Sequence, residues 1–171
     1  MAGPTDGRLR GVYPWRMHQS THLKTRIAGL ADLDTIAPLF DAYRQFYEQP
    51  SDLALATRFI RERLQNAESV ILLACDEAAQ AVGFCQLYPS FCSVEAKPIY
   101  VLYDLFVTPQ ARRTGAGKVL LVAAEQLAAA HGKARMDLTT AKTNLHAQAA
   151  YEALGWVQDA VFYAYSKRVS G

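Results

Sequence analysis

The chain has 171 residues, which is the usual length of a single domain. Residues of the AVILMFWYC set make up 51% of it and charged residues 20%, so burial can outweigh chain entropy and the composition excludes wholesale disorder. With 18 basic and 16 acidic residues, the net charge of +2 excludes a uniform field for holding a polyanion such as DNA. The longest apolar runs, residues 70–75 and 119–124, are far shorter than the ~20 residues of a membrane span. We therefore expect a soluble protein with a local anion site, and neither nucleic acid nor a membrane as partner.

Composition also indicates the domain boundary and the compartment. Residues 1–20 are rich in glycine, proline and arginine and lack the apolar segment of a secretory signal, so we interpret them as an N-terminal arm and residues 21–171 as one domain. Met17 stays open as an alternative start. Three cysteines without a C-x-x-C pair favour neither a disulfide framework nor a thiolate zinc site, and we expect a reducing, cytoplasmic location. Cys75 and Cys85 are expected in the core, and Cys92 is the one to test for reactivity.

Hydrophobic periodicity predicts a mixed α/β domain in which strands and helices alternate. The predicted strands are residues 24–28, 70–75, 81–88, 99–108, 135–140 and one or two strands within 157–169. The predicted helices are residues 32–49, 51–65, 118–131 and 144–154. Capping residues support these bounds, because Ser51 or Asp52 and Asn144 precede helices while Gly132 and Gly155 follow them. The first two helices are expected to form a hairpin, as are strands 70–75 and 81–88.

A strand–turn–helix segment, residues 107–118, has the features of an anion site. Its glycines let the backbone approach a ligand closely, and the free N–H groups of a helix N-terminus point at whatever lies above them. Two common phosphate loops do not fit the spacing. A Walker loop needs glycine at Arg112 and serine or threonine at Val119, and a dinucleotide fingerprint needs glycine at Leu120. The alternative to a phosphate cradle is a glycine-rich turn with solvated basic residues.

The same segment resembles the GNAT N-acetyltransferase superfamily. Residues 112–117, Arg-Arg-Thr-Gly-Ala-Gly, fit its R/Q-x-x-G-x-G/A signature, and residues 104–109 look like its central strand. Residues 144–156 look like its downstream N-x-x-A-x-x-x-Y-x-x-x-G-F segment, with Trp156 in place of the commoner phenylalanine, and residues 32–39 resemble its first helix. The resemblance implies an α/β (α+β) GNAT fold with a central mixed, mostly antiparallel twisted sheet of six to seven strands flanked by about four helices.

The resemblance also implies acetyl-CoA as cosubstrate. In this family the loop binds the pyrophosphate, and the central strand separates from its neighbour so that the pantetheine arm pairs with exposed backbone. The residues carried over to cofactor binding are Phe106, Val107, Arg112, Arg113, Thr114, Gly115, Ala116, Gly117, Lys118 and Asn144. Helix capping explains Asn144 equally well. Independently of the resemblance, the basic side chains of the loop and the helix dipole both attract a pyrophosphate.

Acetyl transfer to an amine requires a neutral nitrogen, yet an alkylamine with a pKa of ~10.4 is only about 0.04% unprotonated at pH 7. Asp104 is the one charged side chain of its strand, and the family often has an acidic residue there that accepts the proton directly or through water. A backbone N–H of Phe106 or Val107 is expected to stabilise the oxyanion. Tyr151 matches the family tyrosine that donates to the leaving thiolate. The alternatives are a solvated or helix-paired Asp104 and a tyrosine that only packs beneath the next strand.

Four residues are predicted to contact the acceptor: Tyr47, Glu48, Tyr88 and Glu95. Aromatic and acidic groups suit a cationic amine, although the same residues are also typical of solvated loop surface. Segments 88–91 and 103–107 also look similar to polyamine-, diamine- and histone acetyltransferase-like members of the family.

The predicted function is therefore an N-acetyltransferase that moves the acetyl group of acetyl-CoA to a primary amine, polyamine-like or lysine-like, by direct attack in a ternary complex. The alternatives are a non-catalytic acyl-CoA-binding regulatory module and, ranked last, nucleic-acid binding by the basic arm. No pair of histidines and carboxylates has metal-ligand spacing, so no metal is predicted. A homodimer is compatible with the sequence but does not follow from it.

Overall fold

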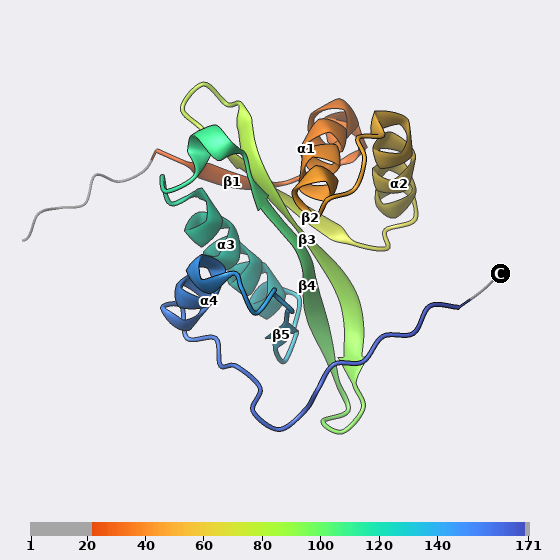
Figure 1. Ribbon diagram of the computed structural model, residues 1–171, viewed down its shortest axis with the longest axis vertical. Helices are drawn as coiled ribbons and strands as arrows, with labels where there is room; N and C mark the ends of the chain where they lie inside the picture. The colour runs from red at the N-terminus through yellow and green to blue at the C-terminus, as the bar shows by residue number, and fades with distance from the viewer. Residues whose placement is uncertain (1–21, 170–171) are drawn as a thin grey trace, which may run out of the picture.

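The computed structural model describes residues 22–169, which form a twisted sheet with a layer of helices on each face (Figure 1). Within this range the five strands follow one another in space as they do in the chain: β1 (Lys24–Ile27), β2 (Val70–Cys75), β3 (Ala81–Cys92), β4 (Lys97–Val107) and β5 (Met136–Asp137). Strands β1 to β4 pair antiparallel, and β5 pairs parallel with β4. The predicted mixed, mostly antiparallel α+β sheet is confirmed, with five strands rather than six to seven.

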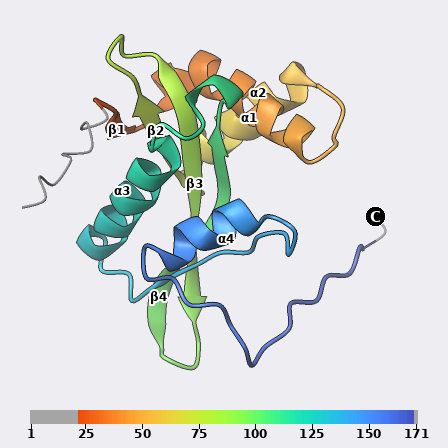
Figure 2. The ribbon, with the colours of Figure 1, turned by 60° about the vertical axis from the view of Figure 1, so that its left-hand side comes forward.

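Two pairs of helices cover the sheet. Helices α1 (Leu33–Phe46) and α2 (Leu53–Gln65) lie on one face, and α3 (Ala116–Ala130) and α4 (Leu145–Glu152) lie on the other (Figure 2). Short 3-10 turns, η1 (Leu30–Asp32) and η2 (Pro109–Ala111), come before α1 and α3. None of the helices between residues 22 and 169 has both the length and the apolar character that crossing a membrane requires.

A buried carboxylate ties the first two helices together. Asp41 of α1 accepts hydrogen bonds from the Ser51 hydroxyl at 2.6 Å and from the Asp52 N–H at 2.8 Å. Asp52 in turn caps α2, because its carboxylate accepts a hydrogen bond from the Leu55 N–H at 2.9 Å. The predicted cap and helical hairpin are thus confirmed, although α1 ends at Phe46 rather than next to Pro50.

The sheet separates two apolar cores. The core under α1 and α2 includes Ile36, Phe40, Ile60, Leu73, Phe84 and Phe106. The core under α3 includes Leu72, Cys85, Leu87, Leu102 and Leu120. Neighbouring residues of β2 and β3 belong to opposite cores, as expected for strands that are buried on both faces. Cys75 and Cys85 are buried as predicted, and Cys92 is half-buried at the end of β3.

A β-bulge changes which side chains of β4 face each core. Gln86 lies opposite Asp104 while its neighbour Leu87 lies opposite Leu102, so Tyr103 is an extra residue on β4. Leu102 packs under α3, whereas Asp104 faces the layer of α1 and α2. In an unbroken strand both side chains would lie on the same face.

The predicted strands after α3 are mostly wrong. Only Met136–Asp137 of the segment 135–140 pairs with β4, and residues 157–169 form neither helix nor strand. The apolar pattern of residues 157–169 is typical of a strand, but a strand needs a neighbouring edge, and β5 has only two paired residues. Every residue from 157 to 169 is exposed, and Figure 2 shows the segment leaving the domain after α4. The predicted N-terminal arm, residues 1–20, lies outside the described residues.

Candidate active site

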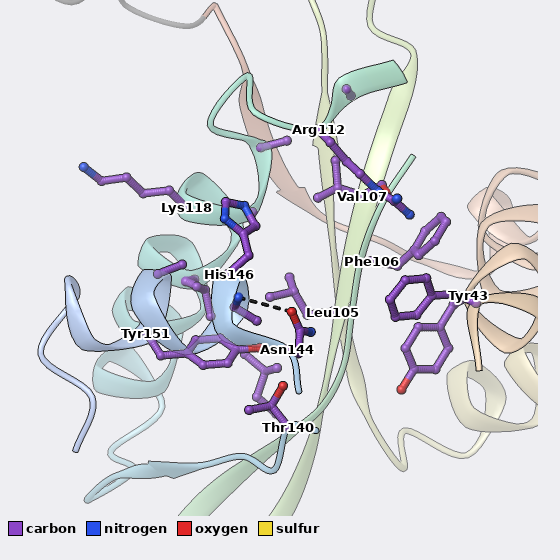
Figure 3. Close-up of a pocket in the computed structure, with 18 of the residues that line it drawn as sticks. Tyr43, Leu105, Phe106, Val107, Arg112, Lys118, Thr140, Asn144, His146 and Tyr151 are labelled. Atoms are coloured by element: carbon purple, nitrogen blue, oxygen red, sulfur yellow. Dashed lines mark hydrogen bonds between the residues drawn. The ribbon is translucent and has the colours of Figure 1, made fainter. Parts of the chain in front are cut away.

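A cavity of about 750 Å³ lies between β4, α1, α4 and the loop that precedes α3 (Figure 3). Its lining residues from β4 are Leu102, Tyr103, Leu105, Phe106 and Val107. One wall consists of Tyr43 and Phe46 of α1 and of Tyr47, which directly follows this helix. The opposite wall consists of Asn144, His146, Ala147, Ala150 and Tyr151. The end of the cavity is closed by Ala111, Arg112, Arg113, Gly115, Ala116, Gly117 and Lys118.

The floor of this cavity is an edge of β4 without a neighbouring strand. β4 and β5 pair only at Tyr100 with Met136 and at Val101 with Asp137. Beyond this pairing, residues 139–140 line the cavity instead of continuing the ladder. The backbone of β4 is therefore accessible from the side, which is the separation of strands that the family resemblance implies.

The direction of the backbone groups along β4 follows from its ladder with β3. The Thr108 N–H donates to the Val82 carbonyl oxygen at 2.9 Å. Because alternate residues of a strand direct their backbone groups to opposite sides, Phe106 also bonds toward β3, whereas Leu105 and Val107 present theirs to the cavity. The backbone of Val107 therefore faces the cavity, whereas the backbone of Phe106 faces β3, although Phe106 is among the lining residues. Leu105 takes that place, and the two-residue period counted from Val107 could have indicated it.

The loop before α3 presents backbone N–H groups to the end of the cavity. Arg113, with a φ of 66°, and Gly115, with a φ of 94°, adopt the left-handed conformation and turn the chain sharply into the helix. The Val119 N–H bonds to the Gly115 carbonyl oxygen at 3.0 Å, so the amides of residues 116–118 have no acceptor within the helix. These amides lie at the positive end of the helix dipole and form an anion site.

Basic side chains surround this anion site. Arg113 and Lys118 are exposed at the end of the cavity. Arg112 extends along the β4 edge, where its Nε donates to the Val107 carbonyl oxygen at 3.3 Å. Its guanidinium lies 5.6 Å from the ring centre of Phe46, so Arg112 bridges the loop and α1.

Two of the predicted cofactor residues of this loop, Thr114 and Gly117, have surroundings that differ from the prediction or do not require the residue type. Thr114 does not line the cavity, because its hydroxyl donates to the Ala111 carbonyl oxygen at 2.7 Å. At Gly117 a Cβ atom would meet Cγ2 of Val107 at 3.9 Å, which is an ordinary contact. Space at position 117 therefore does not require glycine, whereas the left-handed backbone of Gly115 favours it.

Asn144 and Tyr151 both lie on the wall opposite α1. The side-chain Oδ1 of Asn144 accepts a hydrogen bond from the Ala147 N–H at 3.3 Å, so Asn144 caps α4 and also lines the cavity. The Tyr151 hydroxyl points from α4 toward β4 (Figure 3). Burial raises the pKa of Tyr151, and the charge of Tyr47 raises it further. The hydroxyl is therefore protonated, and hence a donor, at neutral pH.

Asp104 lies behind the cavity floor rather than on it. It is 5% exposed, and burial raises its pKa to about 6, against the lowering effect of the Tyr43 hydroxyl. Tyr43 does line the cavity, and its pKa is raised by burial and by the negative charge of Asp104. The Tyr43 hydroxyl itself donates to the Tyr103 carbonyl oxygen at 3.4 Å, so Tyr43 lies at the cavity wall beside the buried carboxylate. The alternative of a solvated carboxylate does not apply.

Of the four residues predicted to contact the acceptor, only Tyr47 lines the cavity. Glu48 follows α1 with a φ of 60° and is exposed outside the lining. Tyr88 is half-buried on β3, where its ring meets that of Tyr103 at a centroid distance of 5.9 Å. It therefore reaches the cavity only through Tyr103.

Glu95 lies in the turn between β3 and β4, away from the cavity. There it forms an ion pair with Arg135, which also donates to Asp137 at 2.8 Å and lies 3.4 Å from the Cys92 sulfur. The Glu95 carboxylate is thus paired at the end of β4 that lies away from the cavity. Among residues 22–169, no three or more histidine, cysteine, aspartate or glutamate side chains are grouped to hold a metal ion.

Some cavity residues carry no motif that indicates them, namely Phe46, Thr139 and Thr140. Phe46 could have been found from its spacing, because positions 43, 46 and 47 fall on one face of a helix. No comparable signal exists for the two threonines. Their place depends on where the chain leaves β5.

Comparison with known proteins agrees with this geometry. The model of the acetyltransferase (GNAT) family matches residues 35–156. The chain belongs to the GNAT family of acetyltransferases. It is 46% identical over 147 residues to the uncharacterized N-acetyltransferase YhfO of Bacillus subtilis (strain 168), covering 86% of this chain and 98% of that protein. It is also similar to a crystal structure of a probable acetyltransferase, with a TM-score of 0.81 and 40% identity, covering 86% of this chain and 99% of that one.

A third similarity covers less of the chain. A probable acetyltransferase of Haemophilus influenzae is 34% identical over 83 residues, which is 48% of this chain and 57% of that protein. As a GNAT enzyme the chain is an acetyl-CoA-dependent N-acetyltransferase, and its acyltransferase activity and α+β fold are as predicted. None of these relatives supports the predicted likeness to polyamine or histone acetyltransferases.

Proposed function

We propose that this enzyme acetylates a primary amine by direct attack on acetyl-CoA within a ternary complex. The observation that carries the proposal is the open edge of β4, which runs from the anion site of the loop to Tyr151. One cavity of this kind can bind the charged part of a cofactor at the loop and bring its reactive group to the other end, near Tyr151. Direct attack then needs no covalent intermediate on the protein.

The loop and the β4 edge are proposed to bind acetyl-CoA, which supplies an activated acetyl group. The amides of residues 116–118, with Arg113 and Lys118, would bind the pyrophosphate through hydrogen bonds and charge. The backbone of Leu105 and Val107 would bind the pantetheine arm. Because Arg112 occupies the Val107 carbonyl oxygen, pantetheine would replace Arg112 there and free its guanidinium for the phosphates.

Asp104 is proposed as the final proton acceptor, acting through Tyr43. With a pKa of about 6, its carboxylate is mostly charged at neutral pH and can still take a proton. The carboxylate does not line the cavity, so the amine proton would reach it by way of the Tyr43 hydroxyl.

Two groups are proposed to stabilise developing negative charge. The N–H of Leu105 or Val107 would face the thioester carbonyl oxygen, and such a donor is worth about 3–4 kcal/mol. Tyr151 would donate to the leaving sulfur. Proton transfer from a tyrosine of pKa ~10 to a thiolate of pKa ~8.5 is uphill by about 2 kcal/mol, and burial raises the pKa of Tyr151 further. Tyr151 would therefore act as a hydrogen-bond donor rather than as a full acid.

The test of this function is thiol release from acetyl-CoA in the presence of primary amines. We expect release that depends on the amine, with the acetylated amine as the second product. The variant Arg113→Ala should raise the KM for acetyl-CoA at least tenfold, whereas Arg61→Ala, an exposed arginine of α2, should not change it. Tight binding of acetyl-CoA without thiol release on any amine would instead favour the regulatory module.

We propose a second copy of the chain as the partner of residues 157–169. This segment exposes Phe162, Tyr163 and Tyr165, each at least 79% accessible. Aromatic side chains bury about 150–250 Å² each. Two such segments, with the surfaces that they cover, therefore exceed the about 1,200 Å² at which specific interfaces begin. An interface between two copies would remove this apolar surface from water.

A further inference from the structure

We infer that the acceptor is a small amine with a single cationic group on an apolar, ring-sized body, and not a polyamine. This inference rests on the proposed amine acetylation and concerns the same cavity. It depends on which surfaces are left for the acceptor once the loop and the β4 edge are assigned to acetyl-CoA.

The α1 wall of the cavity is aromatic. The rings of Tyr43 and Tyr47 meet edge to face at a centroid distance of 5.1 Å, and those of Phe46 and Tyr47 at 5.2 Å. Phe46 and Tyr47 are about half exposed, and Tyr103, the extra residue of the β4 bulge, is 70% exposed at the floor. Apolar faces that remain open at a cavity mouth favour a ligand with an apolar body.

The cavity has no acidic residue among the described residues that line it, its arginine and lysine side chains all come from the loop end, and His146 lines it from α4. The carboxylate coupled to the aromatic wall is Asp104, whose charge acts on Tyr43 and Tyr88. Of the other carboxylates, Asp41 accepts from Ser51, Glu95 pairs with Arg135, and Glu48 is exposed after α1 but outside the cavity lining. Asp104, although it lies behind the floor, therefore provides this wall with the counter-charge for one ammonium group.

A second ammonium would find no comparable partner. It would lose hydration against aromatic rings without a carboxylate, which is costly for a buried charge. An aromatic face can attract a cation, but it supplies no carboxylate to replace the hydration that an ammonium group loses. A polyamine long enough to reach the loop would also approach Arg113 and Lys118, which repel it.

The experiment compares kcat/KM for phenethylamine, putrescine, spermidine and kanamycin at saturating acetyl-CoA and one ionic strength. We expect phenethylamine to exceed each multiply charged amine at least tenfold. Equal or faster turnover of spermidine, putrescine or kanamycin would overturn the inference and leave the proposed function intact. Binding of acetyl-CoA without turnover of any of the amines would contradict the proposed function and this inference together.

Variants of Tyr103 test directly whether its exposed ring at the cavity floor contacts the acceptor. Tyr103→Ala should lower kcat/KM for phenethylamine at least tenfold, mainly through KM, whereas Tyr103→Phe should retain it. Phe91→Ala removes an exposed ring outside the cavity on the same hairpin and is the matched control, expected to leave both kinetic constants unchanged. An equal loss for phenethylamine and putrescine in Tyr103→Ala, at unchanged melting temperature, would show that the ring does not recognise the apolar body.

Discussion

Leu102 and Asp104 are two residues apart on β4 and face opposite sides of the sheet. The extra residue Tyr103 between them reverses the alternation, so that Leu102 packs under α3 while Asp104 is buried beside Tyr43 of α1. The same bulge exposes Tyr103 at the cavity floor. One inserted residue thus separates the apolar core under α3 from the polar group that the proposed proton transfer uses.

The variant Gly83→Ala tests the close contact of β3 with the β4 segment after this bulge. A Cβ atom at position 83 would lie 2.6 Å from the Phe106 carbonyl oxygen, and a backbone atom cannot move aside cheaply. We expect a loss of about 1–3 kcal/mol in the free energy of unfolding, measured by denaturant titration. Gly29→Ala is the control, since no atom lies within 4 Å of its Cβ. Equal stability of the two variants would contradict this packing.

The pH dependence of activity should report the ionisation of Asp104. Below about pH 6 the carboxylate takes up a proton, so kcat/KM should fall about tenfold per pH unit there and level off above it. Asp104→Asn should abolish this inflection together with most of the activity. An unchanged inflection in the variant would assign the proton acceptor to another group.

The same raised pKa has a consequence for stability. Between its ordinary value of 3.8 and about 6, folded Asp104 binds more protons than unfolded Asp104. The contribution of this raised pKa to the free energy of unfolding is therefore fully present below pH 3.8 and is lost as the pH rises through about 6. The difference in unfolding free energy between the wild type and Asp104→Asn, followed from pH 4 to pH 7, should shift in favour of the variant. A difference that is constant with pH would contradict the burial of the charge.

The stability that Asp41 contributes should depend on pH with the opposite sign to that of Asp104. Although burial opposes it, the hydrogen bonds from Ser51 and Asp52 and the charge of Arg44 lower the pKa of Asp41 below 3.8. Its stabilising contribution is thus present above pH 3.8 and is lost as the pH falls through the lowered value. Asp41→Ala should cost about 1–3 kcal/mol at pH 7, because the partners of the carboxylate lose their acceptor. Urea titration at pH 7 and at pH 3 measures the loss of unfolding free energy in this variant at each pH. A loss that is larger at pH 3 than at pH 7 would contradict the lowered pKa of Asp41.

Tyr151→Phe should lower kcat with little change in KM. Loss of a hydrogen bond to a charged sulfur is worth about 1.5–3 kcal/mol, or about 10- to 150-fold in rate. Tyr163→Phe, which removes an exposed hydroxyl far from the cavity lining, serves as the control. Unaltered kcat at unaltered melting temperature would leave Tyr151 with a packing role against Trp156, whose ring centre lies 6.0 Å away.

Removal of residues 157–171 tests the proposed dimer. Analytical ultracentrifugation should show a dimer for the full chain and a monomer for the chain that ends at Trp156. A full chain that sediments as a monomer would contradict a second copy as the partner of this segment. Retention of the dimer after truncation would place the interface on another surface.

Features that depend only on neighbours in the chain could be predicted from the amino-acid sequence. The cap at Asp52, the left-handed Gly115 and the free amides at the start of α3 each need only a few consecutive residues, and all were predictable. Membership of the family and the cosubstrate followed from the same short motifs.

Tertiary structure alone decided what depends on how β4 pairs. The bulge at Tyr103 arises from the register of two strands, and it sends Asp104 behind the floor. Tyr88 and Glu95 suit a cation by type, but Tyr88 on β3 packs against Tyr103, and Glu95 in the turn before β4 pairs with Arg135. Residue type determines which interactions a side chain can make. Strand register, together with the point where β5 leaves the sheet, determines which partners the side chain contacts.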